Sequence, residues 1–208
     1  MSSATKKTHP EKGKYYTYAD YETWDDDFRC ELIDGVIYDM ASPSRAHQEV
    51  SAALLTELHI FLRGKKCKVF HAPFDVRLNA ATKDDIVVQP DILVICDEKK
   101  IENGKHCIGA PDFVVEILSP STSRKDKIIK SRRYFDAGVK EYWLIDPEDR
   151  TVTTLKRSEN CFTYLSYGDD AQIPVSVQDG CIIDMKRVFP PLPEESEIPI
   201  ESELEDNT

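Results

Sequence analysis

The sequence predicts a single α/β domain whose core runs helix, three strands, helix, strand, with a β-hairpin before it and another after it. Three patterns predict this order. Apolar residues recur at helical spacing across 44–64, and two nearly continuous apolar runs, 92–95 and 113–118, are typical of strands covered on both faces. A strongly basic helical segment, 122–137, then precedes a further strand at 139–145. The 208 residues suffice for one substantial core and require no second domain.

Two short elements are predicted ahead of this core. Thr17 and Asp20 are spaced as in a capped first turn and predict a short helix directly after Thr17. Asp34-Gly35 separates two short apolar segments, and this pair readily adopts the positive φ angles of a tight turn. The sequence therefore predicts a hairpin within 29–40.

The core elements have recognisable starts and stops. Ser44 can cap the first long helix. Residues 74–78 alternate between apolar and polar, so we expect them to form the first core strand, ahead of the two apolar runs. Gly138 ends the basic helix, and Asp146-Pro147 stops the strand that follows it. Residues 151–167 predict a second and more exposed hairpin.

The two ends of the chain differ in composition from the part between them. Residues 1–14 and 193–208 are polar or acidic and poor in aromatics, which predicts disordered segments on either side of a domain at 15–192. The formal net charge of −11 argues at first against nucleic-acid binding, which needs clustered lysine and arginine. From Pro193 onward, however, the chain carries seven acids and no base, so the remainder carries only −4.

Composition also bears on location and redox state. No stretch approaches the roughly 18 consecutive apolar residues that a membrane span needs, and the N-terminus lacks the pattern of a secretory signal. We therefore expect a cytoplasmic protein that does not enter a membrane. The six cysteines are scattered without a close pair, so we expect reduced, buried thiols rather than a zinc site or disulfides.

Two carboxylates within the apolar strands are the first candidates for chemistry. Asp91 directly precedes the run 92–95, and Glu116 lies inside the run 113–118. Burying an unpaired charge is costly, so such positions favour a metal or a cationic partner. Magnesium takes oxygen ligands and keeps several waters, so one or two converging carboxylates are enough for a site.

Asp112 is a rival to Asp91, because Pro111-Asp112 repeats the pair Pro90-Asp91. Four residues of strand would separate the carboxylates of Asp112 and Glu116 by roughly 13 Å, at about 3.3 Å per residue. These two groups could not share one metal ion. Asp91 is therefore the expected partner of Glu116.

These motifs resemble those of a known family. The resembling segments are Glu31-Leu32-Ile33-Asp34-Gly35, Ser42-Pro43-Ser44 with His47, Pro90-Asp91, residues 109–122, then Asp126, Lys130, Tyr134, Gly138-Val139 and Glu141-Tyr142-Trp143. Together they resemble the bacterial Uma-type restriction endonucleases of the PD-(D/E)XK nuclease superfamily, from about Tyr18 to Tyr167. The resemblance implies a restriction endonuclease-like core with the element order predicted above.

The same resemblance implies a reaction and a cofactor. It implies metal-dependent hydrolysis of a phosphodiester, with DNA as the expected substrate and Mg²⁺, or Mn²⁺ as its substitute, as the cofactor. The metal ligands would be Asp91 and Glu116, the backbone carbonyl of Ile117 and, as an added acid, Glu31. Asp34 is a nearby alternative to Glu31, and His47 is a further residue of the family pattern that could lie near the site.

One departure from the superfamily concerns its lysine. The superfamily motif would place lysine at position 118, where this chain has Leu118, so the positive charge must come from elsewhere. Lys130 is the expected replacement. Asp126, Lys130 and Tyr134 fall at i, i+4 and i+8 on one face of the basic helix, whereas Lys127 lies on another face.

The basic helix also suggests how nucleic acid could be held. Six cations lie in a ten-residue window that contains one acid. Besides Lys130, the expected phosphate contacts are Arg124, Lys125, Lys127, Arg132 and Arg133, although a merely solvated helix face would have the same composition. We expect a homodimer, because two-fold assemblies are the commonest and two sites could cut two strands.

Two other functions fit the same residues. A nuclease fold without turnover, acting as a binding or regulatory module, would suit the negative charge and the missing lysine at position 118. A nuclease for RNA, or for branched or single-stranded nucleic acid, would use the same site chemistry. Nothing in the sequence reads bases in a recognisable way.

Overall fold

The computed structural model describes residues 9–25 and 27–191. Its centre is a six-stranded sheet in the order β11-β10-β9-β8-β6-β3. These strands are β3 (Lys68–His71), β6 (Ile92–Ile95), β8 (Phe113–Ile117), β9 (Glu141–Asp146), β10 (Thr151–Arg157) and β11 (Phe162–Tyr167). Within this sheet, as far as the structure describes the chain, only β8 and β9 pair in parallel, and the helical segment between them makes the crossover.

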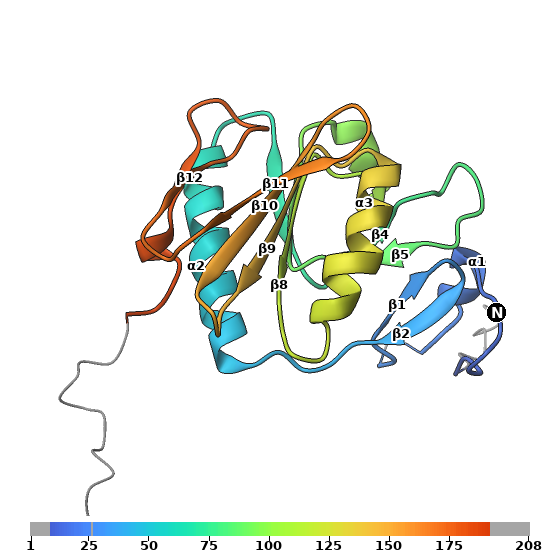
Figure 1. Ribbon diagram of the computed structural model, residues 1–208. Coiled ribbons are helices and arrows are strands. Elements are labelled where there is room, and N and C mark those ends of the chain that lie inside the picture. The colour runs from blue at the N-terminus through green and yellow to red at the C-terminus, as the bar shows by residue number, and fades with distance from the viewer. Residues whose placement is uncertain (1–8, 26, 192–208) are drawn as a thin grey trace, which may run out of the picture.

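Helices cover both faces of this sheet (Figure 1). On one face lies α2 (Arg45–Leu62), whose buried residues at helical spacing pack against Ile92, Val115 and Trp143. On the other face lies α3 (Ser131–Ala137), whose Tyr134 packs among Leu93, Val114 and Tyr142. Successive strand residues thus enter two separate cores, as expected where apolar runs are covered on both sides. The predicted fold class is confirmed.

A second sheet of five short strands lies beside the α3 face, on the right in Figure 1. Its order is β2-β1-β5-β4-β7, with β1 (Cys30–Ile33), β2 (Val36–Asp39), β4 (Val76–Arg77), β5 (Val87–Val88) and β7 (Cys107–Ile108). The hairpin β1–β2 turns at Asp34 and Gly35, whose φ angles of 55° and 75° are those of the predicted tight turn. The preceding helix α1 (Tyr18–Tyr21) begins with the predicted capping box of Thr17 and Asp20.

The prediction for the first core strand was wrong. The strand that pairs with β6 is β3, at 68–71, whereas Val76 and Arg77 form β4 in the other sheet. Strand β3 is the edge of its sheet and is only half-buried, so its sequence carries no strong apolar pattern. The alternating residues at 74–78 serve the smaller sheet instead.

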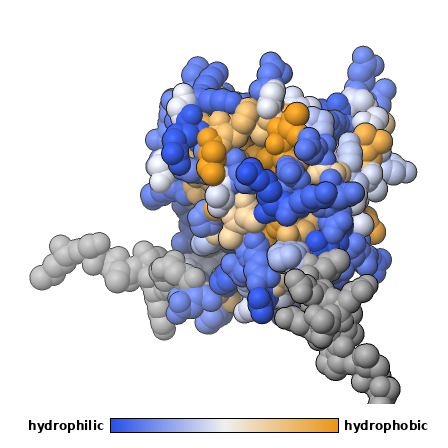
Figure 2. Space-filling model, turned by 90° about the vertical axis from the view of Figure 1, so that its left-hand side faces the viewer, coloured by the Kyte–Doolittle hydropathy of each residue, from blue (hydrophilic) through white to orange (hydrophobic). Residues whose placement is uncertain are grey.

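Three short elements and a small hairpin complete the described chain. They are η1 (Glu98–Ile101), η2 (Lys125–Lys130), η3 (Met185–Arg187), and the pair β12 (Gln172–Pro174) and β13 (Ile182–Asp184). The β12–β13 pair packs near α2, and Figure 2 shows this side with apolar side chains gathered among hydrophilic ones. The predicted second hairpin is confirmed as β10–β11, which extends the main sheet.

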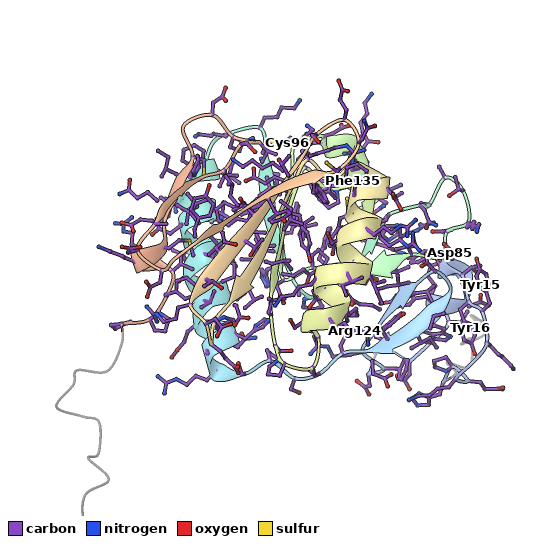
Figure 3. All side chains as sticks on the ribbon, in the orientation of Figure 1. Tyr15, Tyr16, Asp85, Cys96, Arg124 and Phe135 are labelled. Atoms are coloured by element: carbon purple, nitrogen blue, oxygen red, sulfur yellow. A yellow bond between two sulfur atoms is a disulfide. The ribbon has the colours of Figure 1, made fainter. Side chains whose placement is uncertain are left out.

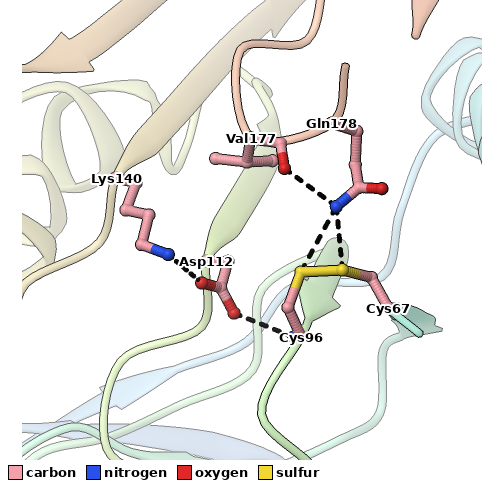
Figure 4. The surroundings of a disulfide bond; sticks show 6 residues. All are labelled: Cys67, Cys96, Asp112, Lys140, Val177 and Gln178. Carbon is pink, nitrogen blue, oxygen red and sulfur yellow. Dashed lines mark hydrogen bonds and ion pairs between the residues drawn. A yellow bond between two sulfur atoms is a disulfide. The ribbon is translucent and has the colours of Figure 1, made fainter. Parts of the chain in front are cut away.

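The expectation of reduced cysteines was wrong for one pair. Cys67 and Cys96 form a disulfide (Figure 4), whereas the other four cysteines are free. Three of these are buried as expected, but Cys161 is exposed. Lys68 pairs with Ile95 in the β3–β6 ladder, so the residues just beyond them, Cys67 and Cys96, face each other. A contact fixed by strand register between residues 29 positions apart leaves no local signal in the sequence.

The ends of the chain and the apolar character of its helices bear on two further predictions. The predicted acidic tail at 193–208 and the first eight residues lie outside the described residues, so the predicted boundaries at 15 and 192 stay predictions. Within residues 9–25 and 27–191, no helix is both long and apolar enough to cross a bilayer.

Candidate active site

One cavity collects the predicted site residues. It has a volume of about 470 Å³ and lies where β8 ends and α2 begins, at the lower end of the sheet in Figure 1. Its walls come from the first hairpin, the start of α2, the residue before β6, the end of β8 and the helical segment after it. The predicted residues on those walls are Glu31, His47, Asp91, Glu116, Ile117, Lys125, Asp126 and Lys130.

Strand register brings the two expected metal ligands together. Ile92 pairs with Val115 in the antiparallel β6–β8 ladder, so Asp91 and Glu116, the next residues outward, lie opposite each other. The backbone N–H of Ile117 donates a hydrogen bond to Asp91 Oδ2 at 2.7 Å, which fixes the carboxylate at the strand end. Asp91 and Glu116 thus meet as predicted.

His47, from the first turn of α2, contacts the other oxygen of Asp91. Its Nε2 lies 3.2 Å from Asp91 Oδ1, and Ser44 caps the helix by accepting from the His47 backbone N–H. Burial would lower the pKa of His47, but the bond to Asp91 outweighs burial and raises it. Its Nδ1 is buried without a hydrogen-bond partner among the described residues.

Lys130 is almost fully buried and points into the acids of the cavity. Its ammonium contacts the Glu116 carboxylate and lies 2.7 Å from Glu31 Oε1 and 3.7 Å from Asp126 Oδ1. Burial would lower the pKa of Lys130, but Glu116 and Glu31 outweigh it and raise the pKa well above its ordinary value. Lys130 is therefore a fixed cation and no proton acceptor at neutral pH. Tyr134 donates to Glu116 Oε1 at 2.7 Å.

Glu31 lies at the other side of Lys130, brought there by β1. Its two oxygens accept from Lys130 and from Lys125, the latter at 2.6 Å, and the Gln89 backbone N–H adds a third bond. Burial would raise the pKa of Glu31, but the two lysines lower it below its ordinary value. The rival Asp34 points elsewhere, because it pairs with Arg133.

The helix that carries the lysines is not a regular α-helix. Residues 125–130, η2, are π-helical, and the Ser131 backbone N–H donates to the Asp126 carbonyl, five residues back. Residues five positions apart share a face in a π-helix, so the wider turn brings Lys125 and Lys130 to the same side, where both reach Glu31. Such π-helical insertions are frequent at functional sites.

The charges in the cavity do not balance. Among its nearly fully buried groups three acids, Glu31, Glu116 and Asp126, face Lys130 alone. Asp91, His47, Lys125 and the exposed Arg29 complete the charged lining. Burial raises the pKa of Glu116 well above its ordinary value, and the acids Asp126, Asp91 and Glu31 oppose the lowering effect of Lys130. Burial likewise raises the pKa of Asp126. The surplus of negative charge favours an added cation.

This donor set fits a divalent cation of the magnesium type. Within the described ranges, no three His, Cys, Asp or Glu side chains gather so closely that they could hold a metal by themselves. Magnesium does not require that, because it is held by one or two carboxylates and keeps its waters. The open cavity at Asp91 and Glu116 leaves room for such waters.

The expected phosphate-contacting residues divide into two groups. Arg124, Lys127 and Arg132 are exposed on the helix surface, and Figure 3 shows Arg124 near the lower end of that helix. Arg133 is engaged by Asp34 and Asp136. Lys125 lies inside the cavity against Glu31, a position that its α-helical spacing did not indicate. Gln89, which also lines the cavity, was not anticipated.

Asp112 lies outside this cavity, at the opposite end of β8. Its carboxylate accepts from Lys140 Nζ at 2.6 Å and from the Cys96 backbone N–H at 2.8 Å, beside the disulfide (Figure 4). Its exclusion from the site on grounds of distance agrees with this position.

Two proteins with similar sequences are described as uncharacterized. The chain is 32% identical over 117 residues to an uncharacterized protein of Synechocystis sp. (strain ATCC 27184 / PCC 6803 / Kazusa), covering 55% of this chain and 60% of that protein. A second uncharacterized protein of the same organism is 29% identical over 120 residues, covering 57% of this chain and 66% of that protein. The chain thus spans less than two thirds of these relatives.

A solved structure and a family model each match a larger part of the chain than these two relatives do. The crystal structure of a protein described as "a putative nuclease", from Anabaena variabilis ATCC 29413, matches with a TM-score of 0.69 at 22% identity. The match covers 84% of this chain and 97% of that one, and it shows the shared fold. The model of the Uma2 family, described as "Putative restriction endonuclease", matches residues 18–186. The resemblance seen in the sequence is thereby confirmed, and this protein belongs to the Uma2 family.

Proposed function

We propose that this protein is a metal-dependent endonuclease that hydrolyses phosphodiester bonds in DNA. One observation carries the proposal: Asp91, Glu116 and Lys130, from three separate elements, converge in one cavity. The membership of the Uma2 family supports it. Magnesium, with manganese as its substitute, is the proposed cofactor, and a cytoplasmic homodimer is the proposed form of the protein.

Each residue of the site would have a distinct role in this reaction. Asp91 and Glu116, with the Ile117 backbone carbonyl, would hold the divalent cation, and Glu31 and Asp126 would add negative charge around it. When bound, such a cation supplies Lewis-acid polarisation of the phosphoryl oxygen and a bound water of lowered pKa. The bond from the Ile117 N–H orients Asp91 in advance.

Lys130 would act as a cation and not as a base. Its raised pKa keeps the ammonium charged, so it can stabilise the negative charge that develops on the phosphate or orient a water by donating a hydrogen bond. In the structure the ammonium contacts Glu116 and Glu31. Binding of a metal by Glu116 would leave Lys130 anchored by Glu31.

Cleavage assays with matched variants test the proposal. We expect the purified protein to cut or nick DNA with Mg²⁺ or Mn²⁺, and to lose this activity in EDTA, in Asp91→Asn and in Glu116→Gln. The expected decrease is at least about 100-fold, as for loss of a preorganised electrostatic group. Glu148→Gln, an exposed residue of the β9–β10 turn, is the matched control and should keep full activity. Unchanged cleavage in both site variants would reject this site.

A second candidate function rests on a specific contact. Glu116, an expected metal ligand, already pairs with Lys130 and Tyr134, and this would suit a nuclease fold that binds nucleic acid without turnover. Isothermal titration with Mn²⁺ separates the two functions. Heat of binding that disappears in Asp91→Asn supports the enzyme, whereas absent metal binding with intact DNA binding supports the second function.

A further inference from the structure

A second cavity adjoins the candidate active site and is lined by aromatic rings. It has a volume of about 350 Å³, within the range of small-molecule pockets of roughly 300–1,000 Å³. Tyr18, Tyr21, Trp24 and Phe28 supply its rings, and neighbouring rings of this set lie in contact. Tyr21 and Phe28 are partly exposed, whereas Tyr18 and Trp24 are buried against them. Aromatic side chains are the usual platforms on which proteins stack unpaired nucleobases.

The two cavities share part of their walls. Arg29, Pro73 and Gln89 line both of them, so the aromatic cavity opens beside the site that holds Asp91 and Glu116. A nucleotide adjoining the scissile phosphate could therefore reach the aromatic rings. Arg29 is exposed and forms no ion pair within the described ranges, so its guanidinium is available to a phosphate at this junction.

Apart from Arg29, the charged side chains that line the aromatic cavity are the carboxylates Glu22, Asp25 and Asp75, which accept hydrogen bonds. Asp75 accepts from Tyr21 and from Gln89 Nε2, which fixes the orientation of the Gln89 amide. The Gln89 Oε1 is then left buried with no hydrogen-bond partner among the described residues. A buried acceptor without a partner is costly, and Gln89 lines this cavity, so a ligand whose N–H reaches the oxygen after a shift of the amide would be favoured.

We propose that this cavity is a nucleobase pocket, and that the substrate strand carries an unpaired nucleotide next to the scissile phosphate. Single-stranded DNA, or a base turned out of a duplex, meets this requirement. Because the walls accept hydrogen bonds, a base with several N–H donors, guanine above all, fits better than thymine, which presents one N–H between two carbonyls. The inference rests on the proposed function and names its substrate class.

Tryptophan fluorescence tests the pocket without any need for cleavage. The chain has two tryptophans, and Trp143 is completely buried in the main core, so Trp24 reports on the aromatic cavity. We expect dGMP, titrated into the full-length protein in EDTA, to quench this signal saturably and more tightly than dTMP. Inorganic phosphate should not quench it. The quenching should disappear in Trp24→Phe, which removes the reporter and keeps an aromatic ring.

Affinity for DNA tests the role of the rings. We expect a single-stranded oligonucleotide to bind more tightly than the same sequence as a duplex, and Tyr21→Leu to weaken single-strand binding roughly tenfold. Tyr21→Phe keeps the ring and should bind nearly as well, which separates stacking from misfolding. Tyr164→Leu is the matched control, because Tyr164 is exposed on β11 outside the pocket.

Several results would overturn the inference. The first is the absence of saturable quenching by dGMP. The second is quenching by tetramethylammonium in place of dGMP, which would mark a cation pocket. The third is equal affinity of Tyr21→Leu and wild type for the single strand. Metal-dependent cleavage with no nucleotide binding would reject the pocket and leave the nuclease in place. Nucleotide quenching without cleavage would keep the pocket and reject the proposed function.

Discussion

Strand β8 connects two buried acids that lie in opposite surroundings. Asp112, just before the strand, accepts from one lysine and one backbone N–H, and among the described residues no second acid pairs with that lysine. Glu116, near the other end, contacts Lys130 in a cavity that holds three more acids. Both acids lie in or beside the same apolar run and both contact a lysine, so the contact with a lysine does not by itself distinguish a structural acid from a functional one.

The pKa values of these two acids are shifted in opposite directions. Burial would raise the pKa of Asp112, but Lys140 and the Cys96 N–H outweigh it and lower the pKa. Burial raises the pKa of Glu116, and the neighbouring acids oppose the effect of its lysine. A buried acid whose charge is matched by donors is structural, whereas one left with surplus negative charge marks a place for a cation.

The largest expected effect is that of Lys130→Met. Removing one partner of a buried charge pair leaves uncompensated charge, so we expect the free energy of unfolding to fall by about 3–5 kcal/mol. Urea unfolding followed by circular dichroism measures it. Adding Glu116→Gln to Lys130→Met should restore about 1–3 kcal/mol without restoring cleavage. If the single variant were as stable as wild type, the buried cluster would not exist as described.

Loss of the disulfide should have the next largest effect, at the Asp112 end of the molecule. The bridge joins residues 29 positions apart, and closing such a loop stabilises a protein by about 2–4 kcal/mol. We expect Cys67→Ser with Cys96→Ser, or a reducing agent, to lower the free energy of unfolding by this amount. Cys161→Ser is the control, because Cys161 is free and exposed. No change on reduction would show that the bridge does not form.

A smaller effect is expected for Asp112→Asn, of about 1–2 kcal/mol, because a charged hydrogen-bond acceptor is lost. Its folded pKa is lowered, so its contribution is complete above the unfolded carboxyl pKa of about 4 and disappears as the pH falls through the folded pKa. The stability difference between wild type and Asp112→Asn should therefore narrow below about pH 4. A constant difference down to pH 2 would contradict this assignment.

The smallest effect is expected for Lys140→Met. The Lys140 side chain is 64% exposed, so solvent screens its attraction to Asp112, and such pairs contribute about 0.2–1 kcal/mol. Cleavage by this variant should equal that of wild type, because Asp112 and Lys140 lie outside the active-site cavity. A cleavage rate as low as that of Glu116→Gln would show that the two ends of β8 act together.

The elements that could be predicted from the sequence are those with local signals. The turn at Asp34-Gly35, the cap at Ser44 and the apolar strands β6 and β8 are each specified by neighbouring residues. The edge strand β3 and the two-residue strands of the second sheet depend on tertiary pairing, and their own sequences carry little pattern. The disulfide depends on strand register in the same way.

In the candidate site, too, the residues with a local signal could be predicted and those placed by tertiary structure could not. Asp91 and Glu116 were recognisable because each stands in or beside an apolar run, and Lys130 was indicated through the resemblance and its helical spacing. The approach of Lys125 to Glu31 could not be foreseen, because it follows from the π-helical turn at 125–130. The aromatic cavity was missed, although six aromatic residues between Tyr15 and Phe28 were a visible signal.

The bond between Glu31 and Lys130 has a consequence for the order of folding. It joins residues 99 positions apart, from the N-terminal hairpin to the π-helical segment η2, whereas β8, η2, α3 and β9 follow one another in the sequence. Distant contacts form late, because a long loop must close before they contribute. We expect the central sheet to assemble first and the cluster around Lys130 to close only when the hairpin docks.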